Sequence, residues 1–169
     1  MSIFGFVSVL IAVISVAAIV LHNRVMGKRA PVDTHLARLE DLLRDRVEMI
    51  YRYSRPGSEL RGLCDEYIDL DFESIIKTLP DIGRAFEDEK EAGNLIISEP
   101  LDDDLDPEAD DYVTMAGLES NAQAIIETTT TLNQAIESYN SFITGRPQEI
   151  LMARVLGLTT KEPLSQTFL

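Results

Sequence analysis

The stretch Ile3–Leu21 reads IFGFVSVLIAVISVAAIVL and contains nineteen residues without a charged side chain. At a rise of about 1.5 Å per residue, a helix of this length crosses most of a hydrocarbon core about 30 Å thick. A cleaved secretory signal would instead have a basic residue before the apolar run and a small-residue cleavage site after it. Neither feature is present. We therefore expect residues 1–22 to form an uncleaved transmembrane anchor.

The cations that flank this apolar run lie on one side only. Arg24, Lys28 and Arg29 follow it, whereas no basic side chain precedes it. Because basic segments stay on the cytoplasmic side, this asymmetry predicts a single-pass protein of the cell membrane with a cytoplasmic C-terminal domain. Residues 23–31 are then a basic juxtamembrane link that lies close to membrane lipid.

Small residues recur within the apolar run. Gly5, Ser8, Ala12 and Ser15 fall at helical spacing and define one face of the expected span. Faces of this kind let two helix backbones approach closely in lipid. Self-association into a homo-oligomer is therefore one hypothesis, and a chance distribution of small residues is the alternative.

The net charge of −14 is unevenly distributed along the chain. Residues 22–55 contain eight Lys or Arg against five Asp or Glu, residues 56–145 four against twenty-two, and residues 146–169 three against two. The regional charges are therefore +3, −18 and +1. The basic segment fits a domain close to anionic lipid. The acidic body argues against nucleic acid as a partner, because phosphates require a cationic surface.

After the anchor, apolar residues follow helical rather than alternating periods. We expect Pro31 in the first turn of a new helix, and Pro56-Gly57 should end that helix. Its apolar stripe steps by three or four residues. The stripe consists of Val32, Leu36, Leu39, Leu43, Val47, Ile50 and Tyr53.

Ser58 is a suitable N-cap for the next helix. We expect this helix to kink near residues 69–72 and to end at Pro80, with a short amphipathic piece from Ile82 to Ala92 after it. Gly93 then opens an acidic loop over residues 93–111, whose composition resists folding on its own.

Alternating aspartates at positions 102, 104 and 106 of this loop raise the alternative of a calcium site. An EF-hand loop requires Gly at its sixth position and Glu at its twelfth. Pro107 and Val113 occupy those positions. We therefore predict a solvated loop and no metal site.

The most regular period in the chain lies between Thr114 and Thr144. Apolar positions there step three-four-three-four for four heptads. A last helix should run from Pro147 to Leu156 and stop at Gly157, followed by an irregular tail over residues 158–169. The heptad seam consists of Met115, Leu118, Ala122, Ile125, Thr129, Leu132, Ile136, Tyr139 and Ile143.

These periods predict an all-α protein. Long helices joined by short turns pack as an antiparallel bundle, which we place at residues 32–157 with about four helices. A parallel coiled-coil dimer is the alternative, although the interrupted second helix disfavours a simple coil.

The sequence has few residues for chemistry. His22 and His35 are its only histidines, and it has neither a Glu-x-x-His pair nor a phosphate-binding glycine loop. We therefore expect no catalytic residues, no cofactor and no enzymatic activity. The single cysteine, Cys64, is expected to be a buried apolar residue on a helix, in a reducing compartment.

The arrangement resembles the LemA family of bacterial proteins, which have an N-terminal membrane span and a helical-bundle domain. Its first signature, I-D-V-Q-L-K-R-R-x-D-L-I-P-N-L-V-E, aligns without gaps with residues 32–48, where Arg44 and Asp45 replace the family's Pro and Asn. Matching positions are Asp33, Leu36, Arg38, Asp41, Leu42, Val47 and Glu48.

The second signature of the family is a Tyr-Asn pair repeated after five residues. Leu132-Asn133 and Tyr139-Asn140 keep this spacing, although the first tyrosine is lost. Pro147, Ala153 and Gly157 resemble the motif that closes the family's domain. The resemblance implies a membrane-anchored helical bundle and no defined activity.

Asn133 and Asn140 lie seven residues apart and therefore on one helix face. Buried asparagines of this kind set helix register through cross-helix hydrogen bonds. A polar ladder that binds a partner is the alternative.

Two functions remain open. The first is a membrane-anchored scaffold or protein-interaction module on the cytoplasmic side. The second is a ligand-responsive signalling or sensor subunit of a membrane complex. The anchor, the basic link and the absent active site favour the scaffold.

Overall fold

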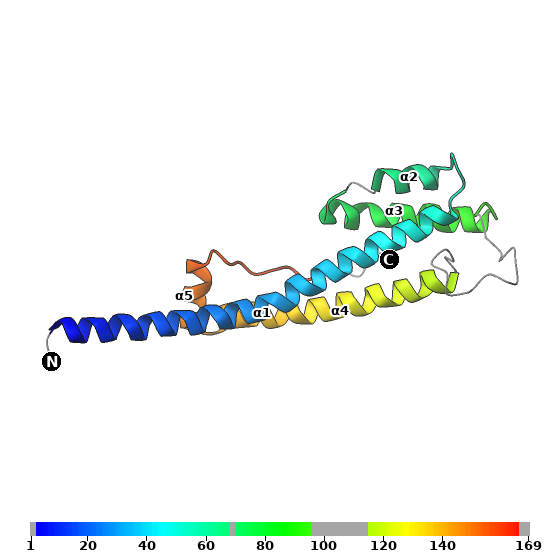
Figure 1. Ribbon diagram of the computed structural model, residues 1–169. Helices are drawn as coiled ribbons and strands as arrows, with labels where there is room; N and C mark the ends of the chain where they lie inside the picture. Colours follow the sequence, from blue (N-terminus) through cyan, green and yellow to red (C-terminus); the bar gives the residue numbers. More distant parts are fainter. Residues whose placement is uncertain (1–2, 68–69, 96–114, 166–169) are drawn as a thin grey trace, which may run out of the picture. The chain divides into compact units, whose positions relative to one another are not determined.

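The computed structural model describes residues 3–67, 70–95 and 115–165, and it is helical with no strand in these ranges (Figure 1). The predicted all-α class is therefore confirmed. Most of the acidic loop, including the aspartates considered for calcium, lies outside the described residues. The helices are α1 (Ile3–Tyr53), α2 (Glu59–Tyr67), α3 (Phe72–Glu91), α4 (Met115–Gly145) and α5 (Pro147–Val155).

Helix α1 is a single helix of 51 residues, with Pro31 in its interior. The prediction that a new helix begins at Pro31 is therefore wrong, and the basic residues 23–31 are helical. Proline has no N–H, so the carbonyl of Gly27 loses its usual donor, at a cost of about 3 kcal/mol for an interior proline. Val25 and Val32 are 0% and 1% exposed. Their burial seven residues apart holds one helix face against its neighbours on both sides of the proline.

Helices α2 and α3 differ from the sequence prediction in two places. Where the sequence predicts a kink within one helix, α2 ends at Tyr67 and α3 begins as a separate helix at Phe72. The Asp71 side chain accepts a hydrogen bond of 2.9 Å from the Ser74 N–H and caps α3. Pro80, expected to end a helix, lies inside α3. The helix continues because its buried face crosses the proline without a change of period. That face consists of Ile75, Leu79, Ile82 and Phe86.

The prediction of a separate helix from Ile82 to Ala92 is also wrong, because these residues continue α3. The predicted cap at Ser58 and the predicted turns at three glycines are confirmed. The Ser58 hydroxyl accepts a bond of 3.2 Å from the Arg61 N–H at the start of α2. Gly57, Gly93 and Gly157 have φ of +81°, +67° and +64°, so each stands where the chain turns left-handed after a helix.

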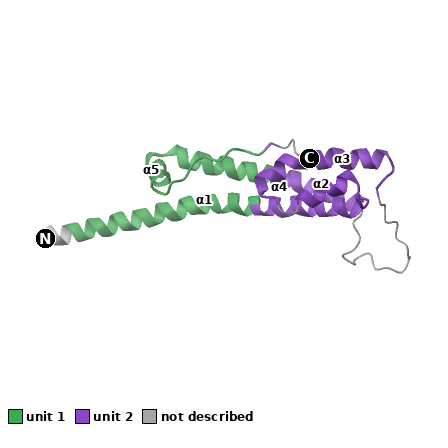
Figure 2. Cartoon of the chain, turned by 90° about the horizontal axis from the view of Figure 1, so that it is seen from above, with its two compact units in different colours: residues 1–36, 130–164 green, residues 37–129, 165–169 purple. Residues whose placement is uncertain are grey.

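The chain forms two compact units (Figure 2). Unit 1 comprises residues 1–36 and 130–164, and unit 2 comprises residues 37–129 and 165–169. Each unit takes one part of α1 and one part of α4. In unit 2, Arg46 donates to the Leu118 carbonyl at 3.2 Å and Asn121 donates to the Leu42 carbonyl at 3.0 Å. The two helices are therefore antiparallel there, as the bundle prediction requires.

The predicted heptad seam of α4 is its buried face. Ile125 and Leu132 are 0% exposed, and Thr129 and Tyr139 are each 1% exposed. Met115 and Ala122 are half-buried. The other helices of the two units also bury apolar residues. These include Leu39, Leu43, Val47, Ile50, Leu60, Cys64 and Ile82 in unit 2, and Val32 and Ala153 in unit 1.

Adjacent isoleucines on α4 offer a matched test of this packing. Ile125 is 0% exposed, whereas Ile126 is 39% exposed. Ile125→Asp places a charge in the core and should cost several kcal/mol of a total of about 5–15 kcal/mol, whereas Ile126→Asp should cost less than about 1 kcal/mol. Thermal melting of the full chain in detergent, followed by circular dichroism, measures both. Equal melting of the two variants would contradict the buried seam.

Candidate functional site: an asparagine clamp on the C-terminal segment

Residues 158–164 follow α5 and return along α4 within unit 1 (Figure 1). Gly157 allows this reversal, since its positive φ lets the Leu158 N–H bond the Ala153 carbonyl at 2.8 Å. The Tyr139 hydroxyl then donates to the Thr159 carbonyl at 3.2 Å. The returning segment therefore begins its contact with α4 at Tyr139.

Two asparagines of α4 hold this segment by its backbone. Asn140 donates from Nδ2 to the Lys161 carbonyl at 2.7 Å and accepts from the Lys161 N–H at Oδ1 at 2.9 Å. Asn133 makes the same pair of bonds with Leu164, each 2.9 Å long. Each amide thus occupies both hydrogen-bonding groups of one residue. We call Asn133 and Asn140 the asparagine clamp.

The spacing of the two clamp asparagines matches the spacing of the two backbone residues that they hold. Seven helical residues rise about 10.5 Å, and three residues of extended chain span about 9–10 Å. Asn133 and Asn140 are seven residues apart, and the residues that they hold are three apart. The helix therefore presents two amides in register with every third residue of an extended chain. Pro163, between the two held residues, favours an extended chain.

A charged contact connects the same segment with α1. Lys161 Nζ lies 3.2 Å from Asp33 Oδ1, and Arg29 Nε lies 3.1 Å from Asp33 Oδ2. The Lys161 and Asp33 side chains are 33% and 48% exposed, so this pair contributes at most about 1 kcal/mol. The asparagine bonds therefore contribute more to holding the segment than the ion pair does.

The arrangement differs from the register-setting role expected for these asparagines. Both are half-buried, and their side-chain bonds go to the chain's own C-terminal segment rather than to a second helix. The tail has no regular structure through residue 165, as predicted, but its backbone is held. Sequence reasoning missed this segment. The available signal was the seven-residue spacing, which fits three extended residues as well as two helical turns.

The predicted packing face of the span lies in α1. The side chains of Ser8, Ala12 and Ser15 are exposed, and Gly5 lies in the same helix. Association through this face stays a prediction.

Cys64 is 0% exposed, which confirms its predicted burial. Burial raises the pKa of its thiol to about 11, with a smaller contribution from the Asp65 carboxylate. The thiolate is therefore scarce at neutral pH, and the residue behaves as a small apolar side chain.

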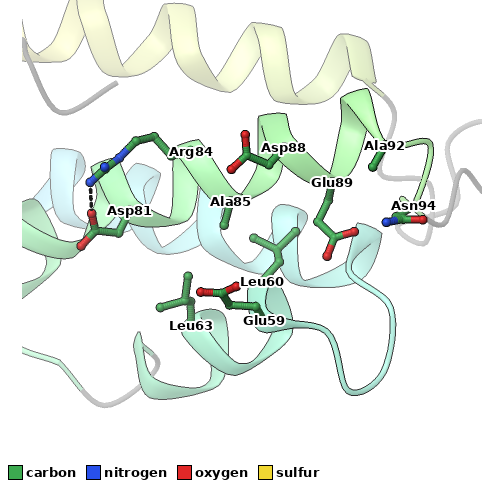
Figure 3. A pocket seen from close by; sticks show the side chains of 10 residues that line it. All are labelled: Glu59, Leu60, Leu63, Asp81, Arg84, Ala85, Asp88, Glu89, Ala92 and Asn94. Carbon is green, nitrogen blue, oxygen red and sulfur yellow. Dashed lines mark hydrogen bonds and ion pairs between the residues drawn. The ribbon is translucent and has the colours of Figure 1, made fainter.

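A cavity of about 580 Å³ lies between α2 and α3 in unit 2 (Figure 3). Glu59, Asp81, Asp88 and Glu89 line it together with Arg84, which pairs with Asp81. No three His, Cys, Asp or Glu of the described residues are arranged to hold a metal ion. This cavity is an acidic surface depression without a ligand set.

Comparisons with known proteins found no match to this chain among protein-family models, curated proteins or solved structures.

The clamp predicts protection of two particular amides from hydrogen exchange. Asn140→Ala should expose the Lys161 amide, and Asn133→Ala the Leu164 amide, because each loses its acceptor. Two net hydrogen bonds are worth about 1–3 kcal/mol, so exchange should accelerate roughly 5- to 150-fold. Asn23→Ala, on an exposed position of α1, is the control. Unchanged exchange at both amides in the clamp variants would show that the segment is held by other contacts.

The raised pKa of the buried Cys64 thiol predicts a loss of folding stability at alkaline pH. Between about pH 9 and 11 the unfolded thiol releases its proton while the folded thiol keeps it, so the free energy of unfolding falls as pH rises. The slope from one such group is at most about 1.4 kcal/mol per pH unit. Denaturant unfolding across this window should show a shallower decline for Cys64→Ala than for the wild type. Parallel declines would mean that the thiol is not the group responsible.

Proposed function

We propose that this protein is a single-pass membrane-anchored interaction module whose helical domain faces the cytoplasm and has no enzymatic activity. The observation that carries the proposal is α1, whose first part is apolar and exposed and whose later part belongs to the folded units. The resemblance to the LemA family, which combines a span with a helical bundle, supports the same reading.

The exposed end of α1 needs an apolar environment. Large side chains between Val7 and Val20 are 45–61% exposed. The most apolar stretch of this helix is long enough to cross a membrane. It has a mean hydropathy of 2.1 and is 6% buried, so its side chains do not form a protein core. A lipid bilayer would cover this surface, since the helix satisfies its own backbone hydrogen bonds.

The asparagine clamp supports an interaction role. It binds the backbone of an extended segment and therefore does not depend on particular side chains. Recognition of an extended chain through its main-chain groups is a common mode of peptide binding. A helical domain that already holds one such segment has the chemistry of a scaffold.

The second candidate is a sensor or signalling subunit. It is favoured by the continuity of α1, which runs from the apolar end into unit 2 without a flexible link. A continuous helix transmits rotation or translation along its axis. A sensor also requires a ligand, so the two candidates differ in what they bind.

Purification from gently solubilised membranes separates the two functions. A recurrent protein partner, identified by mass spectrometry and lost on unfolding with Ile125→Asp, is expected for a scaffold. A small molecule that co-purifies in constant ratio would favour the sensor. Recovery of neither in repeated preparations would oppose both proposals.

The topology is tested by protease protection. In intact bacterial cells, residues 32–169 should resist protease added from outside, because the basic residues after the apolar run retain the domain in the cytoplasm. In inverted membrane vesicles the same residues should be digested. Digestion in intact cells would place the domain on the opposite side. Extraction of the protein by alkaline carbonate would contradict the anchor itself.

A further inference from the structure

A basic groove in unit 1 lies beside the end of the apolar part of α1. Its volume is about 780 Å³. Arg24 and Lys28 line it from one face of α1, Ser138 and Ser141 line it from α4, and Arg146 lines it from the start of α5. Arg146 lies more than 100 residues after Arg24 and Lys28 in the sequence, so only the fold brings it beside them.

The charge of this groove is opposite to that of most of the chain. Three cations and one acid, Glu149, give its lining a formal charge of +2 in a protein of net charge −14. The cavity between α2 and α3 has four acids and one arginine, or −3. Lys28 Nζ lies 3.3 Å from Ser138 Oγ. The guanidinium groups of Arg24 and Arg146 make no ion pair or hydrogen bond with the residues that the structure describes.

The groove lies at the depth of lipid headgroups when the apolar run occupies a bilayer. Arg24 follows Leu21 by three residues and Lys28 by seven, which corresponds to about 4.5 and 10.5 Å along the helix. The headgroup layer on each side of the hydrocarbon core is about 5–8 Å thick. The Cα atom of Arg24 therefore lies within this layer, and that of Lys28 lies just beyond it on the side of the folded domain. Basic pockets at this depth bind anionic headgroups.

We infer that this groove is a binding site for the phosphate of an anionic phospholipid headgroup. The Arg24 and Arg146 guanidinium groups donate to phosphate oxygens, and the Lys28 ammonium adds a point charge. The Ser138 and Ser141 hydroxyls are placed to donate to the same oxygens or to a glycerol headgroup. Phe142, half-buried on the groove wall, leaves an apolar surface beside the acyl chains. The inference rests on the membrane anchoring in the proposed function, and it commits to lipid rather than free phosphate.

The test uses the full chain in nanodiscs made from equal parts of phosphatidylcholine and phosphatidylglycerol. Lipids retained after transfer to detergent are counted by native mass spectrometry. The wild type should retain phosphatidylglycerol in preference to phosphatidylcholine. Each cation near a membrane surface contributes roughly a fivefold preference, so Arg24→Gln/Lys28→Gln/Arg146→Gln should lose it by tenfold or more. Arg38→Gln/Lys77→Gln/Arg84→Gln, with the same change of charge on exposed residues of unit 2, should retain it.

Three results would overturn the site. These are an equal retention of both lipids by the wild type, an unchanged preference in the groove variant, and an equal loss in the control variant. Displacement of phosphatidylglycerol by millimolar inorganic phosphate would overturn the commitment to lipid. Equal melting of the two variants excludes misfolding as the cause of a loss. A groove variant that loses lipid preference but resists carbonate extraction supports the site, whereas extraction of the wild type contradicts the proposed function itself.

Discussion

The apolar face of α4 is the constraint on which both units depend. It is buried on successive turns from Leu118 to Ile143. Among the helices that the structure describes, only α4 and α1 contribute core residues to both units. Burial of each large apolar side chain contributes about 1.5–3 kcal/mol, which far exceeds the helix propensity of any one residue. The antiparallel course of α1 against α4 buries this face along both helices, although α2 and α3 lie between them in the sequence.

The C-terminal segment is held by hydrogen bonds rather than by apolar packing. It has no apolar period of its own, and Asn133 and Asn140 hold it through backbone groups. Since the two bonds of each half-buried asparagine contribute about 1–3 kcal/mol, the asparagines and the segment stabilise each other. The clamp flanks the buried seam at Leu132 and Tyr139. Core packing therefore sets the rotation of α4, and that rotation aims both amides at the segment.

Charge divides the molecule into surfaces of opposite sign. The basic groove of unit 1 and the acidic cavity of unit 2 belong to one chain of charge −14. In the proposed orientation, cations stand beside anionic lipid. The acidic residues 56–145 are repelled by the same surface within roughly a Debye length of about 8 Å. Electrostatics then adds to the apolar anchor in selecting which part of the protein approaches the membrane.

The sequence by itself determined the helical class, the apolar end of α1, the seam of α4, the Ser58 cap and the ends at Gly57, Gly93 and Gly157, because periodicity and caps act over one or two turns. Only the tertiary structure decided that α1 continues through Pro31 and α3 through Pro80. An interior proline costs about 3 kcal/mol locally, and burial of apolar residues on both sides of it offsets that cost. The tertiary structure also decided the partners of Asn133 and Asn140 and placed Arg24 and Arg146 on one groove. These residues lie 21 or more positions apart in the sequence, and local periodicity carries no information about such pairs.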